Sequence, residues 1–98
     1  MKESILVIED ERAIRNFMRA TLEIHSYDCL CAENGKQGII LATSHKPDII
    51  ILDLGLPDID GVDIIKKVRT WSSCPIRVVS ARSEDKDKID ALDLGADD

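Results

Sequence analysis

Short apolar runs alternate with amphipathic segments along this chain. Four runs have the length and composition of buried strands, and they span residues 4–8, 27–32, 48–53 and 76–80. After the first run, apolar residues recur at i, i+3, i+4, i+7 and i+8, starting at Ile14 and including Phe17, which predicts a helix from about Glu11 to His25. Strands that alternate with helices predict a parallel sheet with right-handed crossovers.

The other helices are placed by weaker patterns and by their boundary residues. Residues 39–44 predict a short helix, and Asn34-Gly35 before it predicts a turn. Asp60 lies directly before a helical pattern and is expected to cap its N-terminus. A last helix is expected to start at Ser83. The predicted order is therefore βαβαβαβα.

Length and charge narrow the possible classes of protein. The 98 residues are enough for a single domain, residues 1–98, with a small core. The net charge of -6 argues against nucleic acid as a partner of this segment, because phosphate binding needs a basic face. No apolar stretch approaches the length of a membrane span and no signal peptide is evident, so we expect a cytoplasmic protein without membrane contact.

The three cysteines are Cys29, Cys31 and Cys74. Because side chains alternate along a strand, the thiols of Cys29 and Cys31 should lie on the same face. A metal site is an alternative there, although no histidine or further cysteine lies at ligand spacing. We therefore expect three reduced, largely structural thiols.

Carboxylates follow two of the predicted strands. Glu9 and Asp10 come directly after the first, and Asp53 ends the third. Ligands of open parallel sheets bind at the carboxyl ends of the strands, so the three acids share one pocket if these strands are neighbours. Carboxylates that lie so near one another bind protons more tightly, unless a cation such as Mg²⁺ is present. A carboxylate beside Mg²⁺ is also a workable nucleophile towards a phosphoryl group.

Structural roles are the alternative for these acids. Asp10 could cap the first helix, and Glu11 could interact favourably with the helix dipole. Asp53 taken alone could be a solvated carboxylate at a strand end.

The whole series of motifs is more specific than any one of them, and it resembles the receiver domain of two-component response regulators, closest to the OmpR/PhoB subfamily. The matching segments are residues 5–11, 46–58, 80–84, 87–89, 91–93 and 95–98, and the resemblance extends from one end of the chain to the other. The resemblance implies a flavodoxin-like (CheY-like) α/β fold, a doubly wound parallel sheet with strand order 2-1-3-4. The fifth strand, the fifth helix and the phosphate-contacting lysine of the family would be missing from a receiver truncated at residue 98.

The resemblance also implies a site. Asp53 matches the phosphoacceptor and one of the Mg²⁺ ligands. Asp10 matches a direct ligand, Glu9 a ligand through water, and the carbonyl of Gly55 the third protein ligand. The phosphoryl donor would be a sensor histidine kinase.

Further positions match the switch and the dimer face of the family. Ser80 matches the hydroxyl that moves towards the phosphoryl group, and Ala81 the residue whose backbone amide faces it. Charged pairs across the dimer face are matched by Lys88, Asp97 and Asp98. A complete receiver of this kind would form a homodimer through the face of its fourth helix, and would contact DNA only through a C-terminal domain that these residues do not include.

The resemblance implies a transcriptional regulator that catalyses only its own phosphorylation and dephosphorylation. Two other functions remain as alternatives. A truncated receiver could act only in binding or dimerisation, because an uncovered edge strand invites pairing with another chain. A phosphohydrolase with an aspartyl nucleophile is the second alternative. Such enzymes typically need another aspartate two residues after the nucleophile, where this chain has Gly55.

Overall fold

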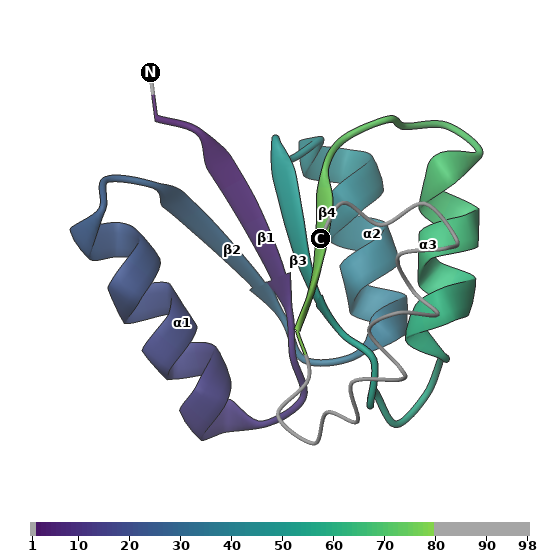
Figure 1. Ribbon diagram of the computed structural model, residues 1–98, viewed down its shortest axis with the longest axis horizontal. Helices are drawn as coiled ribbons and strands as arrows, with labels where there is room; N and C mark the ends of the chain where they lie inside the picture. Colours follow the sequence, from purple (N-terminus) through teal and green to yellow (C-terminus); the bar gives the residue numbers. More distant parts are fainter. Residues whose placement is uncertain (1, 80–98) are drawn as a thin grey trace.

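The computed structural model describes residues 2–79. The elements of that part, in chain order, are β1 (Ser4–Ile8), α1 (Arg12–Ile24), β2 (Asp28–Ala32), α2 (Gly35–His45), β3 (Ile49–Asp53), α3 (Gly61–Arg69) and β4 (Ile76–Val79). The strands form one parallel sheet in the order β2-β1-β3-β4 (Figure 1). The alternation, the parallel sheet and the strand order predicted from the sequence are confirmed. The helix expected after Ser83 lies outside the described residues.

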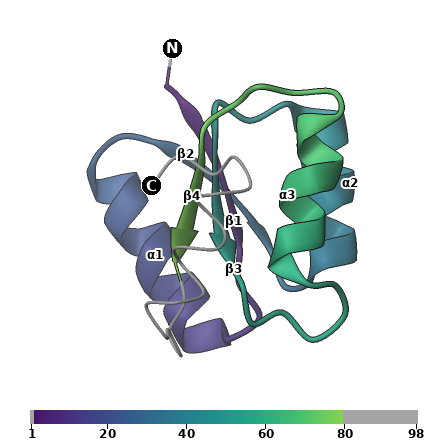
Figure 2. The ribbon, with the colours of Figure 1, turned by 45° about the vertical axis from the view of Figure 1, so that its right-hand side comes forward.

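The elements form three layers. Figure 2 shows α1 on one face of the sheet and α2 with α3 on the other. The chain passes from β1 through α1 to β2 at the edge, and α2 then returns it across the sheet to β3 on the other side of β1. The direction of winding therefore changes at β1 and β3, where open α/β sheets bind their ligands.

The core lies between the sheet and the two helices α2 and α3. Alternate residues of the central strands β1 and β3 belong to this core together with the buried face of α3. The strands contribute Leu6, Ile8, Ile50 and Leu52, and α3 contributes Ile64, Ile65 and Val68, all almost fully buried. Burying an aliphatic side chain of this size contributes about 1.5–3 kcal/mol before entropy is counted. No helix in residues 2–79 has the length and apolar character needed to cross a bilayer.

The opposite face is covered less completely by α1. None of the residues of α1 is buried, and Phe17, which the helical spacing places in the apolar stripe, is 71% exposed. The half-buried positions of the stripe are Ile14, Met18 and Leu22. The prediction of the helix was right, but its inward face is narrower than the spacing indicated.

The predicted turn at Asn34-Gly35 is the start of α2. The side chain of Asn34 caps the helix by accepting a hydrogen bond from the backbone N–H of Gln37 at 2.8 Å. Asp58, from the loop after β3, accepts two more from the N–H groups of Gly35 and Lys36 at 2.8 and 2.9 Å. These carboxylate contacts satisfy N–H groups that a helix terminus otherwise leaves without partners, and they allow a glycine-containing segment to be helical.

A second glycine of α2 sets the distance between this helix and the sheet. A Cβ atom at Gly38 would lie 2.5 Å from Cδ1 and 2.9 Å from Cγ1 of Ile8. Such distances are far inside van der Waals contact, so the helix approaches β1 this closely only because residue 38 has no side chain.

The third helix begins as predicted. Asp60 is its N-cap, and its carboxylate accepts a hydrogen bond from the N–H of Val62 at 3.0 Å.

Candidate functional site

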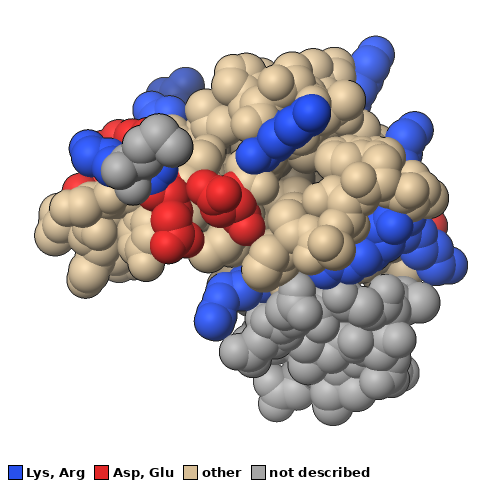
Figure 3. All heavy atoms as spheres, turned by 90° about the horizontal axis from the view of Figure 1, so that it is seen from above, with Lys and Arg blue, Asp and Glu red and all other residues tan. Residues whose placement is uncertain are grey.

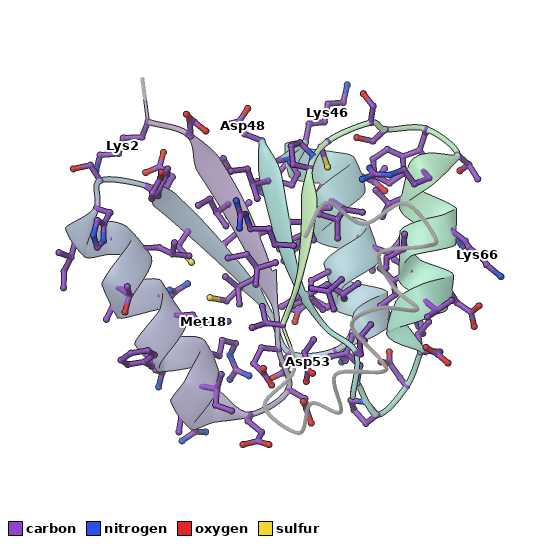
Figure 4. All side chains as sticks on the ribbon, in the orientation of Figure 1. Lys2, Met18, Lys46, Asp48, Asp53 and Lys66 are labelled. Atoms are coloured by element: carbon purple, nitrogen blue, oxygen red, sulfur yellow. The ribbon has the colours of Figure 1, made fainter. Side chains whose placement is uncertain are left out.

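The acidic residues meet where β1 and β3 end. Ile8 is paired with Leu52 in the sheet, so the next residues, Glu9 and Asp53, lie beside each other at the carboxyl ends of the two strands. Asp10 follows on the same side, and one oxygen from each of the three carboxylates lies within 4.8 Å of the others. Figure 4 shows Asp53 at this end of the sheet. The predicted convergence of the three acids is therefore confirmed.

Burial strongly affects the protonation of this cluster. The side chains of Glu9 and Asp53 are each only 3% exposed. Burial raises the pKa of Glu9 from 4.5 to about 7, and the negative charge of Asp53 adds to the increase. A hydrogen bond from the N–H of Glu11 to Oε2 of Glu9 at 3.1 Å opposes it. The cluster alone therefore retains a proton near neutral pH.

The same forces act on Asp53. Burial is the largest cause of its raised pKa, and the N–H of Gly55, which donates to Oδ1 at 3.0 Å, lowers it. That hydrogen bond holds one oxygen of the carboxylate. The role of the Gly55 carbonyl as a metal ligand stays a prediction.

The donor set fits Mg²⁺. This ion binds oxygen atoms at about 2.0–2.1 Å in an octahedron, so two of its ligands lie roughly 2.9–4.2 Å apart. The carboxylate oxygens of Glu9, Asp10 and Asp53 are already gathered within 4.8 Å, which is close to that range. A bound cation would also displace the proton and relieve the repulsion between the acids. An acidic cluster of this composition is typical of the Mg²⁺ site of receiver domains.

The loop that carries Glu9 and Asp10 is held by the backbone. The N–H of Glu9 donates to the carbonyl of Ala32 at 3.0 Å, which extends the pairing of β1 with β2. Nη1 of Arg15 donates to the carbonyls of Glu9 and Asp10 at 3.0 and 3.4 Å. The sequence did not indicate Arg15 as part of the site, although a basic residue one turn into the helix after the acids was a usable signal.

The capping role considered for Asp10 is wrong. The N-cap of α1 is Glu11, whose own side chain makes no capping hydrogen bond. The metal hypothesis therefore does not compete with helix capping at Asp10.

The opposite end of the sheet has a mixture of charges. Figure 3 looks onto the amino ends of the strands and shows lysine and arginine side chains beside acidic ones. Asp48 at this end, labelled in Figure 4, accepts a hydrogen bond from the N–H of Ser4 at 2.8 Å. Within residues 2–79, the one group of three or more potential metal ligands is Glu9, Asp10 and Asp53.

Several residues with predicted roles lie outside the described residues. They are Ser80, Ala81, Lys88, Asp97 and Asp98. Their roles stay predictions.

Comparison with known proteins identifies the family. Residues 5–98 match the response regulator receiver domain. The chain belongs to this family. Receiver domains generally accept a phosphoryl group without acting as enzymes, and their presence implies a partner histidine kinase.

The most similar curated relatives of this receiver domain include KdpE proteins. Identity is 53% over 95 residues with the KDP operon transcriptional regulatory protein KdpE of Escherichia coli strain K12, covering 97% of this chain and 42% of that protein. It is 43% over 98 residues with KdpE of Staphylococcus aureus strain NCTC 8325, covering 100% of this chain and 42% of that protein. The chain thus spans less than half the length of these relatives.

Solved structures confirm the CheY-like fold of this receiver domain. A putative response regulator from Chloroflexus aurantiacus gives a TM-score of 0.93 at 26% identity, covering 100% of this chain and 83% of that one. A two-component response regulator from Clostridium difficile gives 0.92 at 31% identity, covering 99% and 80%.

Proposed function

We propose that Asp53 is the phosphoacceptor of this receiver domain and that a sensor histidine kinase is its phosphoryl donor. The observation that supports this best is the position of Asp53, which is buried beside Glu9 and Asp10 at the carboxyl edge of the sheet. In this proposal Mg²⁺ is held by Asp53 and Asp10 directly, by Glu9 through water and by the carbonyl of Gly55.

In this proposal the two oxygens of Asp53 have different roles. Oδ1 is held by the N–H of Gly55, and the other oxygen forms the new bond to phosphorus. The bond between phosphorus and the histidine nitrogen of the kinase breaks as this bond forms, and the imidazole leaves. Mg²⁺, when bound, would neutralise the negative charge of the carboxylates and of the phosphoryl oxygens.

Transcription control is the output that we propose. The KdpE relatives are named as transcriptional regulators, and they are more than twice as long as the part that this chain matches. In this proposal, phosphorylation in the cytoplasm moves the hydroxyl of Ser80 towards the phosphoryl group, which faces the amide of Ala81. The domain then dimerises through a face that includes Lys88, Asp97 and Asp98, and a DNA-binding domain outside these residues contacts the promoter.

Phosphorylation can be tested with a small phosphoryl donor. The protein is incubated with acetyl phosphate and Mg²⁺, and its intact mass is measured. We expect an adduct of one phosphoryl group that requires Mg²⁺ and is absent from Asp53→Asn. Asp63→Asn is the matched control, because Asp63 is an exposed carboxylate in the first turn of α3. An adduct that survives in Asp53→Asn, or no adduct in the unsubstituted protein, would refute the proposal.

A further inference from the structure

Two thiols lie in contact on β2, away from the acidic cluster. Figure 1 shows β2 as the strand beside α1 at one edge of the sheet. The Sγ atoms of Cys29 and Cys31 are 3.8 Å apart, and both side chains are half-buried. Arg19 of α1 interacts with both sulfurs, which places them on the face of the sheet that α1 covers. The expected location of both thiols on one face is therefore confirmed.

This arrangement does not favour a disulfide. Residues two apart in a parallel strand are separated by roughly 6.6 Å, and their Cβ atoms by a similar distance, because they point the same way. A disulfide requires Cβ atoms about 3.8 Å apart. Closing the bond would therefore contract β2 where Cys29 and Cys31 are paired with Ile5 and Val7 of β1.

One atom bonded to both sulfurs fits without such a change. With metal–sulfur bonds of about 2.3 Å, two sulfurs 3.8 Å apart subtend an angle of roughly 110° at the bridging atom. That angle is close to the tetrahedral value. Small rotations about the two Cα–Cβ bonds can adjust it while the strand stays paired.

The pair has the wrong number of ligands for zinc. Structural zinc sites use four protein ligands, and in residues 2–79 no further cysteine, histidine or carboxylate forms a three-ligand group with these thiols. A soft metal or metalloid ion that needs only two protein sulfurs suits this pair better than zinc, and thiolate ligands prefer such soft ions.

We infer that Cys29 and Cys31 form a two-sulfur site for a thiophilic centre with a bent geometry, of the kind represented by trivalent arsenic with one organic substituent. With an organic arsenoxide, two arsenic–sulfur bonds form, and the oxygen leaves as water with the two thiol protons. No oxidation state changes.

The surroundings affect how readily the thiols react. Burial raises the pKa of the Cys29 thiol to about 11, with the neighbouring Cys31 as the next cause. The guanidinium of Arg19 opposes this and stabilises the negative charge that develops on sulfur as a proton leaves. Because the oxygen of the arsenoxide leaves as water with both thiol protons, its binding should change little with pH below the pKa of Cys29.

The test uses phenylarsine oxide with the folded protein in a reducing buffer free of thiols. We expect native mass spectrometry to show one phenylarsenic group in place of two protons. Cys29→Ser and Cys31→Ser should each weaken binding by roughly 10²-fold, because a single thiol loses the advantage of two linked bonds. Cys74→Ser is the matched control and should bind like the unsubstituted protein, since Cys74 lies near the start of β4 and away from the pair. Circular dichroism verifies that each variant is folded.

A second arm tests the exclusion of zinc, and a third tests the geometry. Zn²⁺ added in excess should not block the binding of phenylarsine oxide, because the pair supplies only two of the four ligands of a zinc site. The protein unfolded in urea should bind phenylarsine oxide more weakly than the folded protein. The inference fails if either single serine variant binds as tightly as the parent, if Cys74→Ser loses binding, or if unfolding leaves the affinity unchanged. Failure of this site would leave the proposal for Asp53 untouched, because the acidic cluster shares no residue with it.

Discussion

In the absence of divalent cations, Glu9 should make the folded protein less stable as the pH rises. Its pKa is about 7 in the folded protein, against 4.5 for an ordinary glutamate. Between these two values the folded state keeps the proton while the unfolded chain has released it. Stability falls with increasing pH wherever the folded state binds more protons, so the contribution of Glu9 is fully present below pH 4.5 and is lost by about pH 7.

The size of this loss follows from the shift. One pKa unit corresponds to about 1.4 kcal/mol, so the change from 4.5 to about 7 has an upper limit of about 3–4 kcal/mol. Neighbouring acidic side chains contribute to this shift and the cluster is only partly closed to solvent, since Asp10 is half-buried, so the part that depends on Glu9 alone should be smaller. We expect about 1–2 kcal/mol, a measurable fraction of the stability of a small domain.

The assay compares Glu9→Gln with the unsubstituted protein by urea unfolding in EDTA, followed by circular dichroism from pH 4.5 to 8. Because glutamine does not titrate, the variant should gain about 1–2 kcal/mol relative to the parent as the pH rises through this range. Mg²⁺ should stabilise the parent more than the variant at pH 8, since it binds only the folded state. Glu33→Gln, an exposed glutamate at the end of β2, is the control. A stability difference between Glu9→Gln and the parent that does not change with pH would refute the reasoning.

Two further predictions concern α2 and its contact with the sheet. Gly38→Ala should destabilise the protein by about 1–3 kcal/mol in urea unfolding, because the new methyl group meets Cδ1 of Ile8. The loss should be smaller in an Ile8→Val background. A Gly38→Ala variant that is more stable than the parent, as helix propensity alone predicts, would show that the contact is not tight. Asn34→Ala should cost about 1 kcal/mol in the same measurement, since its Oδ1 accepts from the N–H of Gln37; an unchanged midpoint would mean that the cap contributes nothing.

Sequence patterns with a short repeat were enough for most of the fold. Apolar runs ending in Asp53 and before Glu9 identified β1 and β3, because a strand buried on both faces needs a continuous apolar segment. The alternation with helices then implied a parallel sheet, and the carboxyl ends of its strands located the acids. The two-residue repeat of a strand likewise placed Cys29 and Cys31 on one face.

Features that depend on contacts between distant segments were not predictable in this way. The start of α2 was missed because its glycines disfavour a helix locally, and the carboxylate of Asp58 that satisfies its N–H groups comes from the other side of β3. The contact of Arg15 with the acidic loop and the exposure of Phe17 depend on how α1 lies across the sheet.

The period of each element was thus enough to predict which residues form strands and which end of the sheet carries the acids. The near-complete burial of Glu9 and Asp53, and the approach of their carboxylate oxygens to within 4.8 Å of each other and of Asp10, became known only from the folded protein. The physical reason is that a raised pKa and a 3.8 Å separation of two sulfurs both depend on packing between elements, which no single segment encodes.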